Sequence, residues 1–287
     1  MQSPIAAQSH PPTPLSLERD LLDVGASELT RLERLQIRLV RATLRPGPVD
    51  RAIRLLQGSV GQWWIRAATS RLRHVHGVER LPPWIASESI ILVANHRSFF
   101  DLYVTTAELV ARGLPQRLLF PVRSTFFYDH PLGLVVNGTM SFFAMYPPIF
   151  RDRKRASLNV ASLDELATCL RAGGFFVGLH PEGTRKQDDD PYTFLPPQSG
   201  IGRIIHRARV RVVPAFINGL GNDFRKQIFD AVTGRGERIH IVFGAPIPFA
   251  DLFALPGGPK TYKRIAERCI DAISVLGNEE RAIRFSA

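Results

Sequence analysis

His96 and Asp101 are the two side chains of this 287-residue sequence best suited to moving a proton. A neutral imidazole can take a proton from an alcohol at pH 7, and a carboxylate on its other ring nitrogen fixes the tautomer and stabilises the imidazolium. The spacing alone is weak support, because about 0.4 such His-x4-Asp pairs are expected by chance. A plainer interpretation is that Ser98 and Asp101 form a helix cap beside a buried structural histidine. The pair therefore has to be judged with the elements around it.

The apolar run at residues 89–93 predicts a buried strand, because it is short, rich in β-branched residues and flanked by turn formers. Apolar residues then recur at helical spacing from Phe99 to Val110, so we expect a helix to begin near Ser98. His96 would lie on the turn between strand and helix, at the carboxyl edge of the sheet, where open α/β sheets bind ligands.

A second polar motif follows a second buried-strand candidate. Residues 175–179 are apolar and run directly into His180-Pro181-Glu182-Gly183-Thr184-Arg185. A guanidinium, a hydroxyl and backbone N–H groups around a glycine can surround an anionic ligand. The alternative is a polar turn with an ion pair between Glu182 and Arg185. Because both polar motifs follow the ends of predicted strands, we expect them to form one shared site.

In their order and spacing these motifs resemble those of the PlsC-type lysophospholipid (1-acylglycerol-3-phosphate) acyltransferase family. The first family block, Asn-His-x4-Asp, is present at residues 95–101, and the third, Glu-Gly-Thr-Arg, at residues 182–185. The second block resembles residues 149–153, with Arg153 in the place of the family arginine and Arg151 where an apolar residue is usual. The fourth, an apolar strand with proline, is similar to residues 212–217. The resemblance covers about residues 85–250.

The resemblance implies an O-acyltransferase that moves a fatty acyl group from a thioester donor, acyl-CoA or acyl-carrier protein, to a hydroxyl of a glycerophosphate lipid. The expected acceptor is 1-acyl-sn-glycerol-3-phosphate and the product phosphatidic acid, with His96 as general base oriented by Asp101. The acceptor-binding residues implied are Arg123, Arg153, Glu182, Gly183, Thr184 and Arg185. Glycerol 3-phosphate, a lyso-aminolipid, or a non-catalytic basic lipid-binding protein remain alternatives, and Arg123 is equally well explained as a solvated strand end.

Residues 15–80 predict basic amphipathic helices. Between residues 31 and 80 there are eleven Arg, no Lys and three acidic residues. Apolar residues spaced three or four apart, with Arg mostly on the other side, are typical of a helix lying in a membrane interface. The alternative is a helix that packs its apolar stripe on the protein's own core, with Arg in water. We expect this segment to attach the protein to an anionic phospholipid surface, as the family resemblance also suggests.

Composition narrows the remaining choices. The formal net charge of +11 favours anionic partners, but no nucleic-acid-binding module is visible, so no nucleic acid is expected. Cys169 and Cys269 have no metal-ligand spacing, and His74-x-His76 lacks further ligands, so no metal is expected and no cofactor besides the donor substrate. Without a recognisable signal peptide or membrane span, the expected location is cytoplasmic, peripheral on the inner face of the cell membrane.

Strands alternating with helices predict an α/β fold, with a central, mostly parallel sheet flanked by helices. Residues 1–14, rich in proline and small polar residues, are expected to be a disordered tail. Residues 15–80 would form the N-terminal amphipathic helices and residues 81–287 the catalytic domain.

Overall fold

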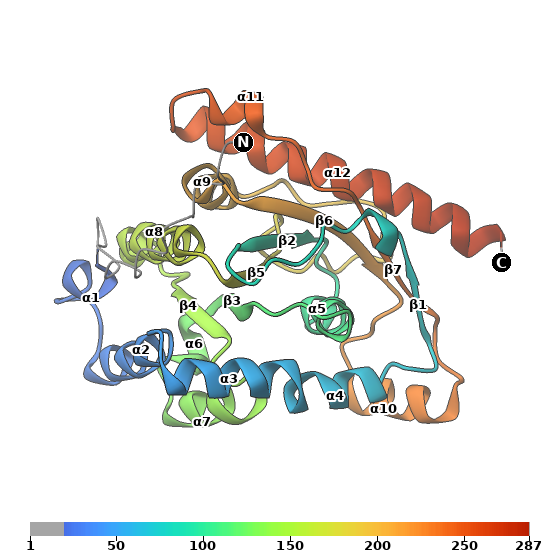
Figure 1. The fold of residues 1–287 in the computed structure, drawn as a ribbon, viewed down its shortest axis with the longest axis horizontal. Helices are drawn as coiled ribbons and strands as arrows, with labels where there is room; N and C mark the ends of the chain where they lie inside the picture. Colours follow the sequence, from blue (N-terminus) through green and yellow to red (C-terminus); the bar gives the residue numbers. More distant parts are fainter. Residues whose placement is uncertain (1–19, 287) are drawn as a thin grey trace, which may run out of the picture.

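The computed structural model describes residues 20–286, without the side chains of Arg153, Phe224, Ile228, Ala231 and Val232. The tail expected at residues 1–14 lies outside this part of the chain. The described residues form a seven-stranded sheet in the order β1-β7-β6-β2-β5-β3-β4, with helices on both faces (Figure 1). Each neighbouring pair is parallel except β6 and β7, which are antiparallel, so the mostly parallel α/β sheet predicted from the sequence is confirmed.

The strands are β1 (Arg73–His76), β2 (Ile90–Ala94), β3 (Arg117–Arg123), β4 (Met145–Ile149), β5 (Phe175–Leu179), β6 (Arg211–Asn218) and β7 (Ile239–Phe243). The helices are α1 (Leu21–Val24), α2 (Arg31–Thr43), α3 (Pro48–Gly58), α4 (Val60–Ala67), α5 (Asp101–Ala111), α6 (Ser124–Phe127), α7 (Pro131–Met140), α8 (Ala156–Ala172), α9 (Ser199–Ala208), α10 (Phe224–Thr233), α11 (Ala250–Phe253) and α12 (Pro259–Ser286). Short 3-10 turns, η1 (Val78–Arg80) and η2 (Arg153–Arg155), complete the order.

Strand β2 lies near the middle of the sheet and explains how the core is divided. Its side chains are all buried and alternate between the faces, as the two-residue repeat of a strand requires. Ile91 and Val93 join the apolar cluster under α8, α9 and α12, whereas Ile90 and Leu92 join the cluster under α4 and α5. A strand covered on both sides needs the continuous apolar run that the sequence shows.

The parallel strands β2, β3, β4, β5 and β6 all end at one edge of the sheet. The loops that follow them, separated in the sequence by tens of residues, therefore meet there. This edge receives both polar motifs found in the sequence.

The N-terminal segment differs from the expected run of helices up to residue 80. Residues 73–76 form β1, which pairs with β7 at the sheet edge, so that part of the expectation is wrong. Within the expected helical segment, the backbone leaves helical geometry at Ser59, which separates α3 from α4. Strand β1 could not be found from residues 73–76 alone, because its stability comes from its partner β7.

Helices α3 and α4 pack one side on the fold and leave another apolar side in water. Ile53 and Ile65 are buried, and the Gln57 side chain exchanges hydrogen bonds with the backbone of Leu118 in β3. Leu55 and Trp63, in contrast, are each 71% exposed. Among the described residues, no helix combines the length and apolar content needed to cross a membrane.

Candidate active site

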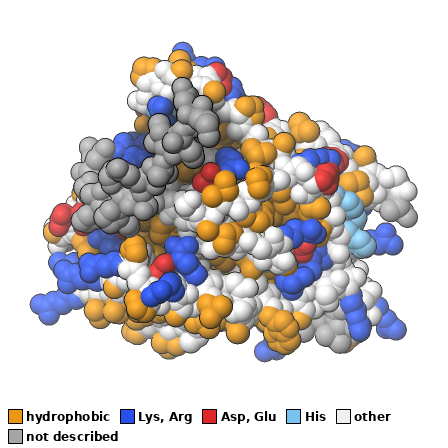
Figure 2. All heavy atoms as spheres, in the orientation of Figure 1, with side chains coloured by type: hydrophobic (Ala, Val, Ile, Leu, Met, Phe, Trp, Pro, Cys, Tyr) orange, Lys and Arg blue, Asp and Glu red, His pale blue; other side chains and the backbone are white. Residues whose placement is uncertain are grey.

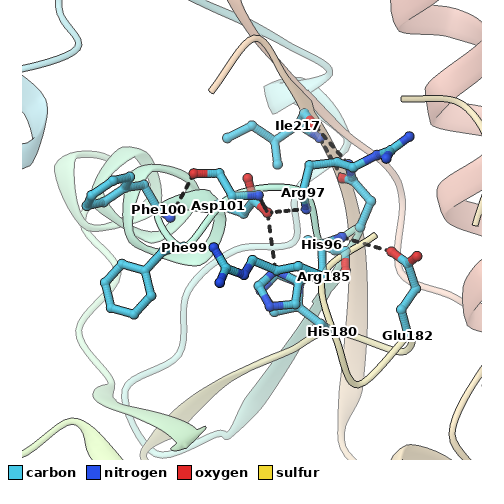
Figure 3. A network of polar contacts seen from close by, with 12 residues as sticks. His96, Arg97, Phe99, Phe100, Asp101, His180, Glu182, Arg185 and Ile217 are labelled. Carbon is cyan, nitrogen blue, oxygen red and sulfur yellow. Dashed lines mark hydrogen bonds and ion pairs between the residues drawn. The ribbon is translucent and has the colours of Figure 1, made fainter. Parts of the chain in front are cut away.

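The turn after β2 is fastened to the neighbouring strand by Asn95. Its buried side chain donates to the carbonyl of Ile217 in β6 and accepts from the N–H of the same residue, both at 2.8 Å (Figure 3). Such a two-point bond continues the sheet's hydrogen bonding through a side chain after the strand has ended. It fixes the backbone from which His96, the next residue, projects.

His96 faces the carboxylate of Asp101, as the sequence predicted. The distance from His96 Nδ1 to Asp101 Oδ2 is 3.4 Å, and the carboxylate is almost completely buried. The same oxygen accepts the N–H groups of Arg97 and Ser98, each at 2.7 Å. These two bonds hold residues 97–100 in a turn, so α5 begins at Asp101 and not near Ser98 as expected.

The environment holds both groups in the forms a general base needs. Burial, followed by the nearby charge of Arg185, lowers the pKa of His96 to about 4. Burial raises the pKa of Asp101 to about 6, against the lowering effect of neighbouring charges and its two backbone donors. At pH 7 the imidazole is therefore neutral and the carboxylate mostly ionised.

Glu182 supports the turn that carries His96. Its side chain is buried, and its two oxygens accept the N–H groups of His96 and Leu195, each at 2.9 Å. Burial raises the pKa of this carboxyl above its usual range. The structure thus shows Glu182 positioning the backbone of His96, and its expected contact with the acceptor stays a prediction.

The other residues of the third block form the rim of the site. Gly183 adopts φ +68°, and a Cβ there would lie 2.6 Å from Gln198 Cγ, which explains the glycine. Its own N–H donates to the carbonyl of His180 and is thereby occupied within the turn. Arg185 is exposed and donates through Nη1 to Asn222 Oδ1 at 2.8 Å, while the exposed Thr184 hydroxyl accepts from Arg151.

Arg151 extends from the loop after β4 to this rim. Its Nη2 lies 3.5 Å from Thr184 Oγ1, and its charge helps to lower the pKa of His96. Burial, and then the charge of Arg123 at the end of β3, lower the pKa of Arg151 itself, so these two cations are neighbours. Arg153 begins η2, and its side chain lies outside the described structure. The rim carries a concentrated positive charge that suits a phosphate.

Three contributors to this site were not among the site residues predicted from the sequence: Arg151, Asn222 and His180. Arg151 follows the end of β4 by two residues, and that strand was not predicted. Asn222 lies in the loop after β6 and bonds Arg185, the N–H of Phe99 and the carbonyl of Arg97. His180 was noted beside the third block, and its position directly after a strand was the signal that could have drawn attention to it.

His180 places a second imidazole against the first. The rings of His96 and His180 are stacked, with centroids 3.7 Å apart and planes 6° from parallel. In the described residues His96, Asp101 and His180 also form a group whose potential ligand atoms lie within 4.8 Å of one another. Nitrogen lone pairs lie in the ring planes, so two parallel stacked rings cannot both direct one at a single ion. The arrangement fits proton transfer better than metal binding.

Comparisons with known proteins agree with this geometry. The sequence model of the Acyltransferase family matches residues 72–218, which is slightly more than half of the chain. This matched range contains both His96 and Arg185. The chain therefore belongs to the Acyltransferase family, and it is an acyltransferase. No curated protein sequence matches the chain significantly.

The fold can be compared with a particular solved structure. It is similar to that of the 1-acyl-sn-glycerophosphate (LPA) acyltransferase PlsC from Thermotoga maritima, with a TM-score of 0.52. The match covers 85% of this chain and 89% of that one, at 19% sequence identity. At this identity the likeness establishes a shared fold.

Proposed function

We propose that the protein transfers a fatty acyl group from a thioester donor to the free hydroxyl of a 1-acylglycerol 3-phosphate, forming a phosphatidic acid. The observation that carries this proposal is the neutral His96 beside the buried Asp101 carboxylate, with Arg151 and Arg185 close enough to lower the pKa of His96. A base next to a cationic rim matches a substrate that carries a hydroxyl and a phosphate on one small molecule. The name of the Thermotoga maritima neighbour describes the same acceptor class.

The reaction follows from these positions. The acceptor hydroxyl oxygen attacks the thioester carbonyl carbon while its proton passes to Nε2 of His96. The Asp101 carboxylate stabilises the imidazolium that forms. The tetrahedral intermediate then collapses, the C–S bond breaks, and the imidazolium returns the proton to the departing thiolate. The logic is that of serine hydrolases, except that the nucleophile belongs to the substrate. Holding the hydroxyl beside His96 can contribute about 7–11 kcal/mol.

Arg185 and Arg151, with Thr184, would bind the acceptor phosphate, and Arg123 and Arg153 would add to the local positive charge. A guanidinium can donate two parallel hydrogen bonds to a phosphate, and such charge-assisted bonds are strong. This cationic rim favours a phosphomonoester acceptor over a lyso-aminolipid. Glycerol 3-phosphate carries the same phosphate, so it is retained as a comparison in the assay.

The test is acyl transfer by the purified protein, with palmitoyl-CoA or oleoyl-CoA as donor. Lysophosphatidate, glycerol 3-phosphate and a neutral lysolipid would be offered as acceptors, with acyl-carrier-protein donors as a further arm. We expect transfer to lysophosphatidate that is lost in His96→Ala. His206→Ala is the control, because it removes another histidine, which lies in α9 and bonds the backbone carbonyl of Leu255 at 3.0 Å. A folded His96→Ala protein with a tenth or more of normal activity would refute the general-base role.

We also propose that the exposed apolar side of α3 and α4 binds an anionic phospholipid surface, on the cytoplasmic face of the cell membrane. Leu55, Val60 and Trp63 protrude from these helices, and arginines lie among them. Figure 2 shows apolar and basic side chains interspersed along the lower edge of the molecule, where Figure 1 places α2, α3, α4 and α7. Apolar residues that protrude among cations suit a helix lying in the interface of an anionic membrane.

A further inference from the structure

The most informative side chain outside the proposed reaction is His180, because it covers one face of the general base. Its ring centroid lies 3.7 Å from that of His96, and the two planes are nearly parallel (Figure 3). The two residues end neighbouring parallel strands, β2 and β5, in which Val93 pairs with Leu179. The stacking therefore joins the ends of two neighbouring strands in the interior of the sheet.

Asp101 does not hold the His96 ring firmly by itself. The 3.4 Å between Nδ1 and the carboxylate oxygen is longer than the 2.7–3.2 Å usual for an N–H···O hydrogen bond. The same oxygen already accepts two backbone N–H groups at 2.7 Å. With a long bond to Asp101 and a backbone contact with Ser98, the ring can still tilt about its bond to Cβ, and such a movement would turn Nε2 away from the acceptor hydroxyl.

His180, in contrast, is well fixed. Its Nδ1 lies 3.0 Å from the carbonyl oxygen of Ala94, which can only accept, so Nδ1 carries the proton. Its backbone carbonyl accepts the N–H of Gly183 and closes the turn that follows β5. A flat ring fixed at both side chain and backbone is suited to restrict the ring stacked on it.

We propose that His180 is a positioning residue, whose ring stacks on His96 and holds the imidazole with Nε2 directed at the acceptor hydroxyl. The proposal rests on the proposed function, in which His96 is the general base. Any flat side chain of similar size could supply the stacking face, whereas a small side chain could not.

The charges around the pair are consistent with this role. Burial, and then the neighbouring His96, lower the pKa of His180 to about 3, so its ring stays neutral when His96 takes up the proton. A second imidazolium at 3.7 Å would oppose that step. The charged groups that face the two rings are Asp101, Arg185 and Arg151. These groups remain in place when His180 is replaced, so a change in the pKa of His96 can be attributed to the lost ring.

The experiment compares His180→Ala, which removes the stacking face, with His180→Phe, which keeps it but loses the bond to Ala94. We expect His180→Ala to lower kcat about 100-fold with the KM values of donor and acceptor within about twofold, because a small misplacement of a catalytic group can cost that much. His180→Phe should recover kcat to within about fivefold of the original. His206→Ala, measured beside them, should leave kcat unchanged, and thermal unfolding should show each variant folded.

A second readout does not depend on activity. In protein labelled with ¹⁵N-histidine, the His96 signals are assigned by their absence in His96→Ala and titrated by NMR. In His180→Ala, water reaches the exposed ring face, so the His96 pKa should rise from about 4 towards its ordinary value. In His180→Phe it should stay low.

The proposal is overturned if His180→Ala keeps both its kcat and the His96 titration of the original protein. It is also overturned if the folded His180→Phe is as slow as His180→Ala, since the loss of the stacking face would then not explain the loss of kcat. If the protein transfers no acyl group to any acceptor, the proposed function fails, and the NMR titration still decides whether His180 controls His96.

Discussion

Replacing Asp101 by Asn removes the charge beside His96, the proposed general base, and keeps nearly everything else. The side chain keeps its size and one carbonyl oxygen, which can still accept the N–H groups of Arg97 and Ser98 that the carboxylate accepts at 2.7 Å. The turn that carries His96 should therefore remain folded. His96 loses the negative charge 3.4 Å from Nδ1, because a neutral carbonyl oxygen then stays at that position.

The size of the effect follows from that distance. Two unit charges 3.4 Å apart interact by about 5 kcal/mol at an effective dielectric constant of about 20. The imidazolium forms only during the reaction, so this attraction lowers the barrier without tightening substrate binding. The carboxylate charge is spread over two oxygens, which reduces the attraction to about 4 kcal/mol. Because each 1.36 kcal/mol corresponds to tenfold in rate, kcat should fall by about 1,000-fold.

The assay is steady-state acyl transfer to lysophosphatidate at pH 7.5, with kcat and both KM values determined for each protein. We expect the KM values of Asp101→Asn to stay within about threefold. Asp251→Asn is the control, because it removes an exposed carboxylate that pairs with Arg268 far from the site. A folded Asp101→Asn protein whose kcat is within tenfold of the original would show that the buried charge does not support the base.

Four further outcomes are expected. Lowering the pH from about 8 to about 5 should reduce kcat/KM with a midpoint near 6, because Asp101, whose pKa burial raises to about 6, is ionised above that pH and neutral below it. Arg185→Ala should raise the acceptor KM about 10- to 100-fold and leave the donor KM nearly unchanged, as expected for a lost charge-assisted bond to the phosphate. Glu182→Gln should lower the free energy of unfolding in urea by about 1–3 kcal/mol, because one buried backbone N–H then faces an amide N–H, and should reduce kcat more than it raises the acceptor KM. Leu55→Asp combined with Trp63→Asp should reduce flotation with anionic liposomes at least tenfold without unfolding the protein, since both side chains are 71% exposed.

Each of these outcomes has a contrary result, and two of them have a matched control. Arg264→Ala removes another exposed arginine, from α12, and should change neither KM. Val275→Asp places a charge at a residue that is 66% exposed on α12, on the opposite side of the molecule from α3 and α4 (Figure 1), and should not affect flotation. The respective argument would be contradicted by an activity midpoint above pH 7, or by equal changes in both KM values for Arg185→Ala. It would also be contradicted by unchanged unfolding of Glu182→Gln, or by normal flotation of the double variant.

Point substitutions are preferable to deletion of the N-terminal segment. Removing residues up to 75 would take away most of β1 and the buried Ile53 and Ile65, so loss of membrane binding could not be separated from loss of folding. The sequence left open whether these helices bind a membrane or pack on the protein. The packing side is now visible in the structure, and the exposed side is what the flotation experiment tests.

Much of the fold was readable from the sequence because its signals are local. Continuous apolar runs at residues 89–93 and 175–179 belong to strands buried on both faces, and each predicted strand was found. Strands β1 and β4 were missed, since one is a four-residue edge strand and the other contains Pro147 and Pro148, which argue against a strand. The start of α5 was misplaced by about three residues, because the Asp101 side chain bonds the backbone of the turn before it.

The sequence by itself determined the contact between His96 and Asp101, because five residues across one tight turn leave few other places for the carboxylate. It also determined that a polar, cationic motif follows a second buried strand. Only the tertiary structure decided that Glu182 supports the backbone of His96, that Arg151 and Asn222 join the rim, and that His180 stacks on His96. Those contacts cross between strands, and they depend on strand order and register, which are set by packing of the whole sheet and not by the spacing of any one segment.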